Sequence, residues 1–129
     1  FYLFIEQKKK EGLAMLRQLG PATIFLTTSP AEIDWPELIV LLSKLVENKQ
    51  ISIEEAKNMS KEEKINLLKR DPVTCARYNA NRDQALESFI LNKKAGPFND
   101  ENPVIDYFKR IEFQTRGSPH SHRMLWLKD

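Results

Sequence analysis

The sequence lacks the features that define several large classes of protein. It has one cysteine, Cys75, so it contains no intramolecular disulfide, and a free buried thiol suits a reducing compartment. No apolar run approaches the roughly 20 residues that a membrane-spanning helix needs. There is no internal repeat, no low-complexity tract and no glycine-rich loop for nucleotide phosphates. We therefore expect an intracellular protein with no membrane segment.

Charge of one sign is also scarce. The formal net charge is +2, which by itself is too mild to indicate nucleic-acid binding. Hydrophobic residues make up 41% and charged residues 29% of the 129 residues, a balance typical of one globular domain with a modest core. We expect a single domain over residues 1–129. Because the sequence starts without methionine and stops just after a predicted strand, we expect it to be a fragment of a longer protein.

The C-terminal stretch, residues 106–129, is predicted to form a β-hairpin. The residues up to Gln114 are mostly aromatic, β-branched or alternately apolar and polar, as in a half-buried strand. Residues 116–119, Arg-Gly-Ser-Pro, have turn chemistry, because Gly accepts a positive φ and Pro fixes φ. Residues 120–127 are predicted to form the second strand.

The two histidines of the sequence, His120 and His122, lie on this second strand. Alternate residues of a strand point to the same face, so both imidazoles project together. Glu112 and Gln114 share one face of the facing strand. Two imidazoles with a carboxylate or amide oxygen suit a divalent metal. For an arbitrary His-x-His, two surface histidines on an edge strand are the commoner arrangement, because two ligands alone hold a metal poorly.

The hairpin resembles that of the His-hydrophobic-His endonucleases, or rolling-circle replication initiators, and is most similar to the N-terminal replication-initiator part of Helitron transposases. The pattern is Glu-Phe-Gln, then x-Arg-Gly-x-Pro-His-x-His, then an apolar strand with Leu-Trp, and it stands here at residues 112–127. Two upstream blocks, residues 25–38 and 71–86, fall in the expected order. Ser121 stands where the superfamily's name implies a bulky apolar residue, which still leaves both histidines on one face.

The resemblance implies an α+β fold with a palm-like antiparallel sheet, in which the metal histidines lie on a middle strand. From the residues themselves we expect strands at 22–28, 104–114 and 120–127, with helices packed on the sheet. The resemblance implies at least one further strand and helix beyond Asp129. Residues 1–129 are thus expected to be the N-terminal and central part of a replication-initiator domain, truncated at its C-terminus.

Capping signals and breakers predict the helices. We expect helices over residues 1–19, 36–46, 53–59, 61–70 and 72–93. The residues expected to cap four of them are Asp34, Ser52, Ser60 and Asp71, and Pro36 and Pro72 suit first helical turns.

Periodicity predicts which helical faces are buried. For the first helix we expect an apolar stripe of Phe4, Ile5, Leu13, Leu16 and Leu19. For the last helix we expect a buried side containing Val73, Ala76, Arg77, Ala80, Gln84, Leu86, Phe89 and Ile90. The charged segment 52–70 is expected to be an inserted surface element. Trp35 is expected to pack in the core, with stacking on a base as the alternative.

The resemblance implies metal-dependent nicking and joining of single-stranded DNA, as in rolling-circle transposition. In that reaction a tyrosine attacks a phosphodiester, forming a 5′-phosphotyrosine and leaving a free 3′-hydroxyl, while a metal polarises the phosphate. The implied ligands are His120 and His122 with Gln114 as the third, and Glu112 is the reserve, which the chemistry alone would prefer. Mg²⁺ and Mn²⁺ both fit such a site.

The family's catalytic tyrosines lie downstream of the histidine strand. The tyrosines here, Tyr2, Tyr78 and Tyr107, all precede the histidines, so none is assigned as the nucleophile. We expect the nucleophile outside this sequence, and the fragment alone to be inactive. The resemblance also implies a helicase domain in the same polypeptide and a nuclear protein.

Basic and hydroxyl side chains around the hairpin are expected to bind single-stranded DNA. They are Arg110, Arg116, Arg123, Lys128, Thr27 and Thr28. The Ser29 hydroxyl could also contact the DNA backbone, and capping of a turn by strand-end hydroxyls explains Thr27, Thr28 and Ser29 equally well. Two other classes of function stay open: a domesticated, non-catalytic module that binds single-stranded DNA, and a structural domain whose histidines bind nothing.

Overall fold

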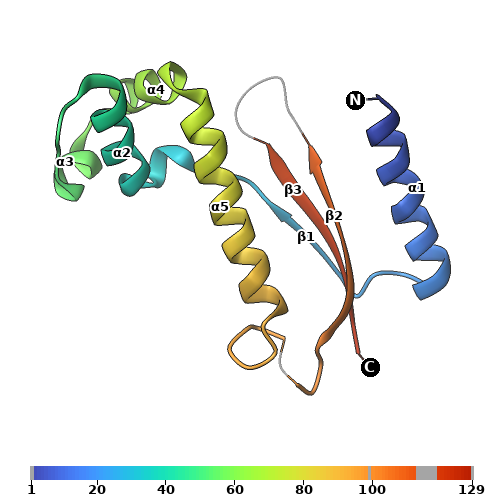
Figure 1. The fold of residues 1–129 in the computed structure, drawn as a ribbon. Helices are drawn as coiled ribbons and strands as arrows, with labels where there is room; N and C mark the ends of the chain where they lie inside the picture. The colour runs from blue at the N-terminus through green and yellow to red at the C-terminus, as the bar shows by residue number, and fades with distance from the viewer. Residues whose placement is uncertain (1, 99, 113–118, 129) are drawn as a thin grey trace. The chain divides into compact units, whose positions relative to one another are not determined.

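The structure is a computed structural model that describes residues 2–98, 100–112 and 119–128, with side chains from Glu6 onward. Along the chain the elements are α1 (Tyr2–Leu19), β1 (Ile24–Thr28), the 3-10 helix η1 (Glu32–Asp34), α2 (Pro36–Glu47), α3 (Ile53–Asn58), α4 (Lys61–Arg70), α5 (Pro72–Leu91), β2 (Val104–Glu112) and β3 (His120–Leu127) (Figure 1). Over these residues the predicted α+β class is confirmed, with five α-helices and a three-stranded antiparallel sheet. Within the same ranges, no helix is both long enough and apolar enough to cross a membrane.

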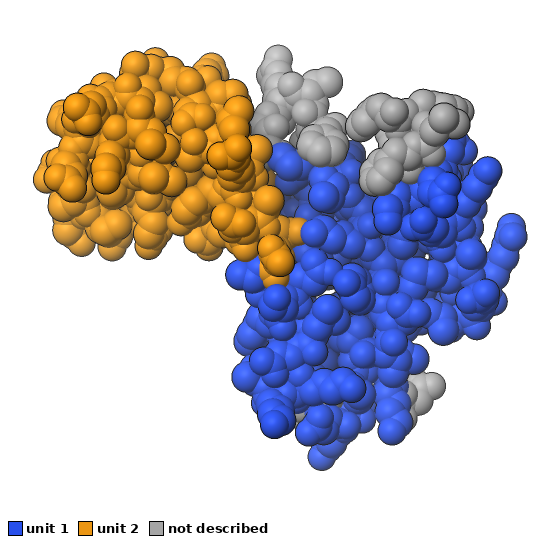
Figure 2. Space-filling view, viewed as in Figure 1, with its two compact units in different colours: residues 1–29, 85–129 blue, residues 30–84 orange. Residues whose placement is uncertain are grey.

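The chain divides into two compact units, coloured blue and orange in Figure 2. Unit 1, residues 1–29 and 85–129, contains α1, the sheet and the C-terminal part of α5. Unit 2, residues 30–84, contains η1, α2, α3, α4 and the first part of α5. The single domain over residues 1–129 stays a prediction.

The sheet of unit 1 has the order β1-β3-β2, so the histidine strand is the central one, as the resemblance implied. Both pairings are antiparallel. Leu125 and Trp126 of β3 are buried at 1% and 3% exposure, which makes this strand part of the unit's core. β1 begins at Ile24 rather than at the predicted residue 22. Residues 113 and 114 of the predicted second strand lie outside the described residues.

Helix α1 packs on the face of the sheet that carries the histidines. Gly12 is buried against Phe108 of β2, and a Cβ atom on Gly12 would lie 3.0 Å from that ring. The indole N–H of Trp126 donates to the Gly20 carbonyl at 3.1 Å. The predicted stripe is wrong at Leu13 and Leu19, which are 46% and 39% exposed, whereas Gly12, which hydrophobicity does not mark, lies against the sheet. The side chains of Phe4 and Ile5 lie outside those that the structure describes.

The opposite face of the sheet is covered by the C-terminal part of α5. There Glu87 of α5 lies 3.7 Å from the guanidinium of Arg123 and 3.6 Å from the ammonium of Lys109. Arg123 is 1% exposed, and pairing with a carboxylate is what allows a charged group to be buried so deeply. The two faces of β3 therefore differ in chemistry, with charge pairs under α5 and imidazoles on the other side.

The core of unit 2 is a cluster of Leu38, Ile39, Leu42, Ala56, Leu67 and Cys75. Ala56 lies on α3 and Leu67 on α4, so the prediction that segment 52–70 is an inserted surface element was wrong. The charged residues that motivated it lie on the outer faces of two amphipathic helices. Trp35 packs against this core, as predicted, with the Arg82 guanidinium 4.2 Å from the centre of its ring.

Three of the four predicted caps form. The Ser52 and Ser60 hydroxyls accept the N–H groups of the third residues that follow, at 3.1 and 3.2 Å, and an Asp71 carboxylate oxygen accepts the Thr74 N–H at 3.1 Å. The prediction for Asp34 was wrong. Asp34 ends the 3-10 turn η1, and the residue before Pro36 is the N-cap of α2, without a side-chain hydrogen bond.

The predicted buried side of α5 was largely wrong. Of the residues predicted to be buried, Val73 and Phe89 are 60% and 51% exposed, although Ile90 is buried as predicted. Cys75 and Asn79 are buried and were not predicted to be. The Asn79 amide donates to the Glu32 carboxylate, so a polar residue occupies a position that hydrophobic periodicity alone does not select. Burial raises the pKa of the Cys75 thiol to about 11, which agrees with an inert core thiol.

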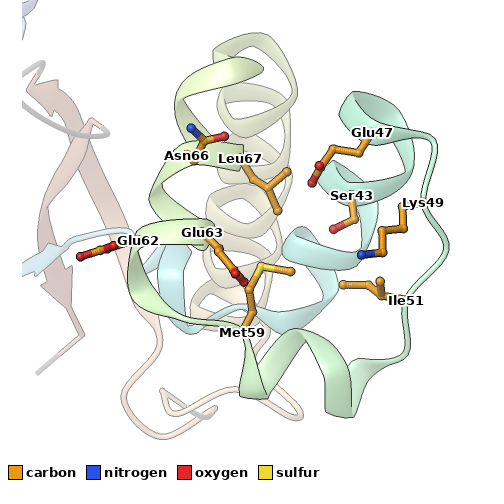
Figure 3. Close-up of a pocket in the computed structure, with 9 residues that line it drawn as sticks. All are labelled: Ser43, Glu47, Lys49, Ile51, Met59, Glu62, Glu63, Asn66 and Leu67. Atoms are coloured by element: carbon orange, nitrogen blue, oxygen red, sulfur yellow. The ribbon is translucent and has the colours of Figure 1, made fainter.

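Unit 2 also has a surface hollow of about 430 Å³ (Figure 3). It is lined by Ser43, Glu47, Lys49, Ile51, Met59, Glu62, Glu63, Asn66 and Leu67. Glu62 points away from the other labelled side chains. The lining mixes carboxylates with one ammonium and apolar groups, and no arrangement in it points to a particular ligand.

Candidate metal and DNA site

His122 lies between partners from both neighbouring strands. Its Nδ1 atom is 3.1 Å from the Thr27 hydroxyl on β1, and its Nε2 atom is 2.7 Å from a carboxylate oxygen of Glu112 on β2. The side chain of His122 is 25% exposed and that of Glu112 is 51% exposed. Each ring nitrogen of His122 thus has a partner, and both His122 and Glu112 remain partly exposed to solvent.

His120, at the start of β3, has a hydroxyl partner at its Nδ1 atom, as His122 does. Its Nδ1 atom is 3.1 Å from the hydroxyl of Ser29, the residue that follows β1. In the register of the sheet His120 lies opposite Glu112, so the two side chains lie on the same face as His122. The predicted common face of His120, His122 and Glu112 is therefore present.

The contacts at the two ring nitrogens of His122 fix the position of its proton. A carboxylate only accepts, so the 2.7 Å contact with Glu112 requires an N–H at Nε2, and the Thr27 hydroxyl can then donate to the Nδ1 lone pair. A metal at Nε2 would replace that proton, and the Thr27 and Ser29 hydroxyls could then accept a proton at each Nδ1. Protein histidines that bind metals are commonly oriented by a partner at the other nitrogen. The hydroxyls of Thr27 and Ser29 stand in that position, and the donor chemistry of the site suits a divalent ion.

The described residues do not complete a metal site. Over the ranges that the structure describes, no three His, Cys, Asp or Glu side chains gather as a metal-binding group. His120, His122 and Glu112 would therefore need a closer approach or a further ligand. Gln114, the predicted third ligand, and Arg116 of the predicted DNA surface both lie outside the described residues.

Two of the predicted DNA-binding residues lie beside the histidines. Thr27 and Arg110 are the register partners of His122 on β1 and β2, so all three share a face, and both partners are exposed. Arg110 places a positive charge next to the imidazoles. This group combines hydroxyl, cation and imidazole on one open side of the sheet.

Three other predicted DNA-binding residues lie elsewhere. Thr28 is half-buried and pairs with Ser121, so it points to the face opposite the histidines. Arg123 is buried on that opposite face beside Glu87 and offers no guanidinium to a phosphate in this structure. Lys128 is exposed, but it follows the end of β3 that is farther from His120.

Tyr107 lies on the face of the sheet opposite the histidines. It pairs with Leu125 in the register, and its phenol is hydrogen-bonded to Glu87. That hydrogen bond, with the negative charge of Glu87, raises the pKa of Tyr107. Because the phenolate is the attacking form in nucleophilic catalysis, this environment disfavours Tyr107 as a nucleophile.

The sequence prediction gave Ser29 only as a hydroxyl that could contact the DNA backbone, and it placed neither Ser29 nor Phe25 against the histidine rings. Residues 25, 27 and 29 share one face of an extended chain, and that period was the signal available in the sequence. Phe25 is 66% exposed, and its ring faces that of His122 with 6.0 Å between centroids and 24° between planes. The face of the histidines thus extends along β1 as well as across β3 and β2.

A family model for the Helitron helicase-like domain at the N-terminus matches residues 4–125. The chain belongs to this family. The matched span contains both histidines and the two upstream blocks, so the resemblance to Helitron proteins is confirmed. Membership of the Helitron family indicates a transposase-related role. No curated protein and no solved structure matches this Helitron domain.

Proposed function

We propose that this Helitron domain binds a divalent metal at His120 and His122 and presents a phosphate of single-stranded DNA for nicking and joining. The observation that carries the proposal is the presentation of both imidazoles on one face of the central strand, with a hydroxyl at each Nδ1 atom. The acid group that meets Nε2 of His122 is Glu112. We propose it as a ligand alongside Gln114.

Different side chains on the histidine face would bind the metal and the phosphate. His120 and His122 would hold the ion through Nε2, and Glu112 would supply an oxygen donor in place of its present contact with His122. Arg110 binds an adjacent phosphate through charge and hydrogen bonds. When bound, Mg²⁺ or Mn²⁺ would supply a Lewis acid that polarises the scissile phosphate.

The rest of the reaction is proposed from the family. The nucleophile is a tyrosine downstream of the histidine strand, and the sheet is part of a palm-like endonuclease fold. A helicase domain is proposed in the same polypeptide. These proposals rest on the Helitron membership and on the face that Tyr107 occupies.

Calorimetry with Mn²⁺ at neutral pH tests the metal site. The 129-residue chain should bind one ion, and the double variant His120→Ala/His122→Ala should give only the heat of dilution. Glu62→Ala removes an exposed carboxylate in unit 2 and should bind Mn²⁺ as the unsubstituted chain does. Equal heats for the unsubstituted chain and the double histidine variant would contradict the proposal.

A second function is favoured by one observation. Within the described side chains, no tyrosine lies on the histidine face of the sheet, since Tyr107 lies on the other face and Tyr78 belongs to unit 2. A module that binds single-stranded DNA without cutting it would need no nucleophile there. In this alternative the domain binds single-stranded DNA through the same surface and forms no covalent bond with it.

A further inference from the structure

We propose that Phe25 is a stacking platform for one unpaired base of single-stranded DNA, placed directly beside the histidines. The inference rests on the proposed DNA function and adds a base subsite to it. Its starting point is exposure: Phe25 is 66% exposed, on a strand of only five residues in the sheet that forms unit 1. A large apolar ring held in water on a rigid element is a surface suited to an apolar or π-bonded partner.

The placement of the ring ties it to the proposed phosphate site. Phe25 and Thr27 point to the same face of β1, and the Thr27 hydroxyl contacts His122. Positions two apart on a strand are separated by about 6.6 Å, so a base on Phe25 lies within one nucleotide of the imidazoles. The ring of Phe25 already lies 6.0 Å from that of His122 and within 24° of parallel.

The packing of α1 explains why this ring stays open. Phe25, Met124 and Phe108 form one row across the three strands on the histidine face. Helix α1 covers the β2 end of the row, where Gly12 meets Phe108. Met124 is half-buried, and Phe25 at the β1 edge is left uncovered. The exposed ring therefore adjoins the open part of the face that carries His122.

The chemistry of the neighbours selects a nucleic-acid base as the occupant. Proteins that bind single strands combine aromatic rings under the bases with basic groups along the backbone. Arg110 is exposed and lies in the row of His122, so a cation for the adjoining phosphate is present on the same face. Every base has a π-face, so stacking on Phe25 adds affinity without strong sequence preference.

Fluorescence anisotropy with a labelled single-stranded oligonucleotide tests the subsite on the 129-residue chain. Phe25→Ala should weaken binding by roughly five- to 150-fold, the range expected for loss of one aromatic–base stack. Phe25→Trp should retain the affinity. Phe89→Ala is the matched control, because Phe89 is also an exposed phenylalanine, at 51%, but lies on α5, which packs on the other face of the sheet.

Oligonucleotides with one abasic nucleotide at successive positions identify the stacked base. The oligonucleotide is kept as short as the site, so that its register cannot shift. For the unsubstituted chain, one position should then show a loss similar to that of Phe25→Ala, and in Phe25→Ala the same abasic position should cost nothing further. A Phe25→Ala chain that melts normally and binds DNA as tightly as the unsubstituted chain overturns the inference. So does an abasic penalty that is equal in both chains.

The outcomes separate this inference from the metal proposal. Mn²⁺ binding without any binding of single-stranded DNA overturns the base subsite and leaves the metal site standing. DNA binding that shows the abasic coupling, in a chain that gives no Mn²⁺ heat, supports the base subsite and overturns the metal site. If a segment of protein covers Phe25 instead, Phe25→Ala should lower the melting temperature and leave DNA affinity unchanged, which also overturns the inference.

Discussion

At the scale of single residues, the arrangement around the histidines depends on two hydroxyls from another strand. The hydroxyl oxygens of Thr27 and Ser29 lie 3.1 Å from the Nδ1 atoms of His122 and His120, and both hydroxyls come from residues distant in sequence from the histidines. Neither hydroxyl is placed to be a third ligand at Nε2. We infer that they orient the rings and would accept the Nδ1 proton once a metal occupies Nε2, the task of outer-shell partners in metal sites.

Removing one of these hydroxyls should weaken the metal site without removing a ligand. Thr27→Val keeps the shape of the side chain and should lower the Mn²⁺ affinity by about 10- to 100-fold, whereas Thr27→Ser should restore most of it. Nitrogen-15 NMR of the imidazoles should show a changed chemical shift of the His122 Nδ1 atom in Thr27→Val, because that nitrogen loses its hydrogen-bond partner. Thr28→Val, on the other face of β1, is the control and should change neither quantity. An unchanged Nδ1 shift in Thr27→Val would contradict this role.

At the scale of elements, helix boundaries in unit 2 are set by short-range chemistry. The Ser60 hydroxyl accepts the Glu63 N–H at 3.2 Å and begins α4, which contributes Leu67 to the core. The first N–H groups of a helix have no partner within the helix, so this contact satisfies a donor that water would otherwise have to meet.

Ser60→Ala should lower the free energy of unfolding by about 1 kcal/mol, the usual effect of losing an N-cap. Urea denaturation followed by circular dichroism measures it. Ser88→Ala, an exposed position inside α5, should change the value by less than about 0.5 kcal/mol. A Ser60→Ala chain as stable as the unsubstituted one would mean that the cap adds nothing to α4.

Features that depend on residues close together in the sequence could be predicted, and features that depend on tertiary contacts could not. Ser52, Ser60 and Asp71 were predicted as caps because the donor and acceptor lie three residues apart. The buried faces of α1 and α5 were not, because they depend on which surface each helix meets. The packing of Gly12 against Phe108 is an example, because a glycine has no apolar side chain to mark its position as buried.

The candidate site likewise has features that could be predicted from the sequence and features that could not. The common face of His120 and His122 follows from the period of a strand, and the same period places Arg123 on the opposite face. The burial of Arg123 was not foreseeable, because it depends on the packing of α5 over that face. The pairing of His122 with Thr27 was not foreseeable from either strand alone. It requires the register between β1 and β3, which packing of the whole sheet determines.

At the scale of the whole molecule, the sheet separates the proposed phosphate site from Tyr107. The 129-residue chain should therefore form no covalent adduct with labelled single-stranded DNA in the presence of Mn²⁺, because no tyrosine lies on the histidine face among the side chains that the structure describes. Denaturing electrophoresis measures the adduct. A band that disappears in Tyr107→Phe would show that Tyr107 is the nucleophile. In a longer chain that carries the proposed downstream tyrosine, a band should form and be lost in His122→Ala.

The central position of β3 has a consequence for the cost of binding. Backbone pairing on both edges of β3 and burial of Leu125 and Trp126 restrict the strand before any ligand arrives. His120 and His122 therefore lose little conformational entropy when they engage a ligand, since their backbone is already ordered. Affinity at this face is decided by the fit of the incoming group to a preorganised surface, and mutations in the core beneath β3 should alter recognition by shifting that surface.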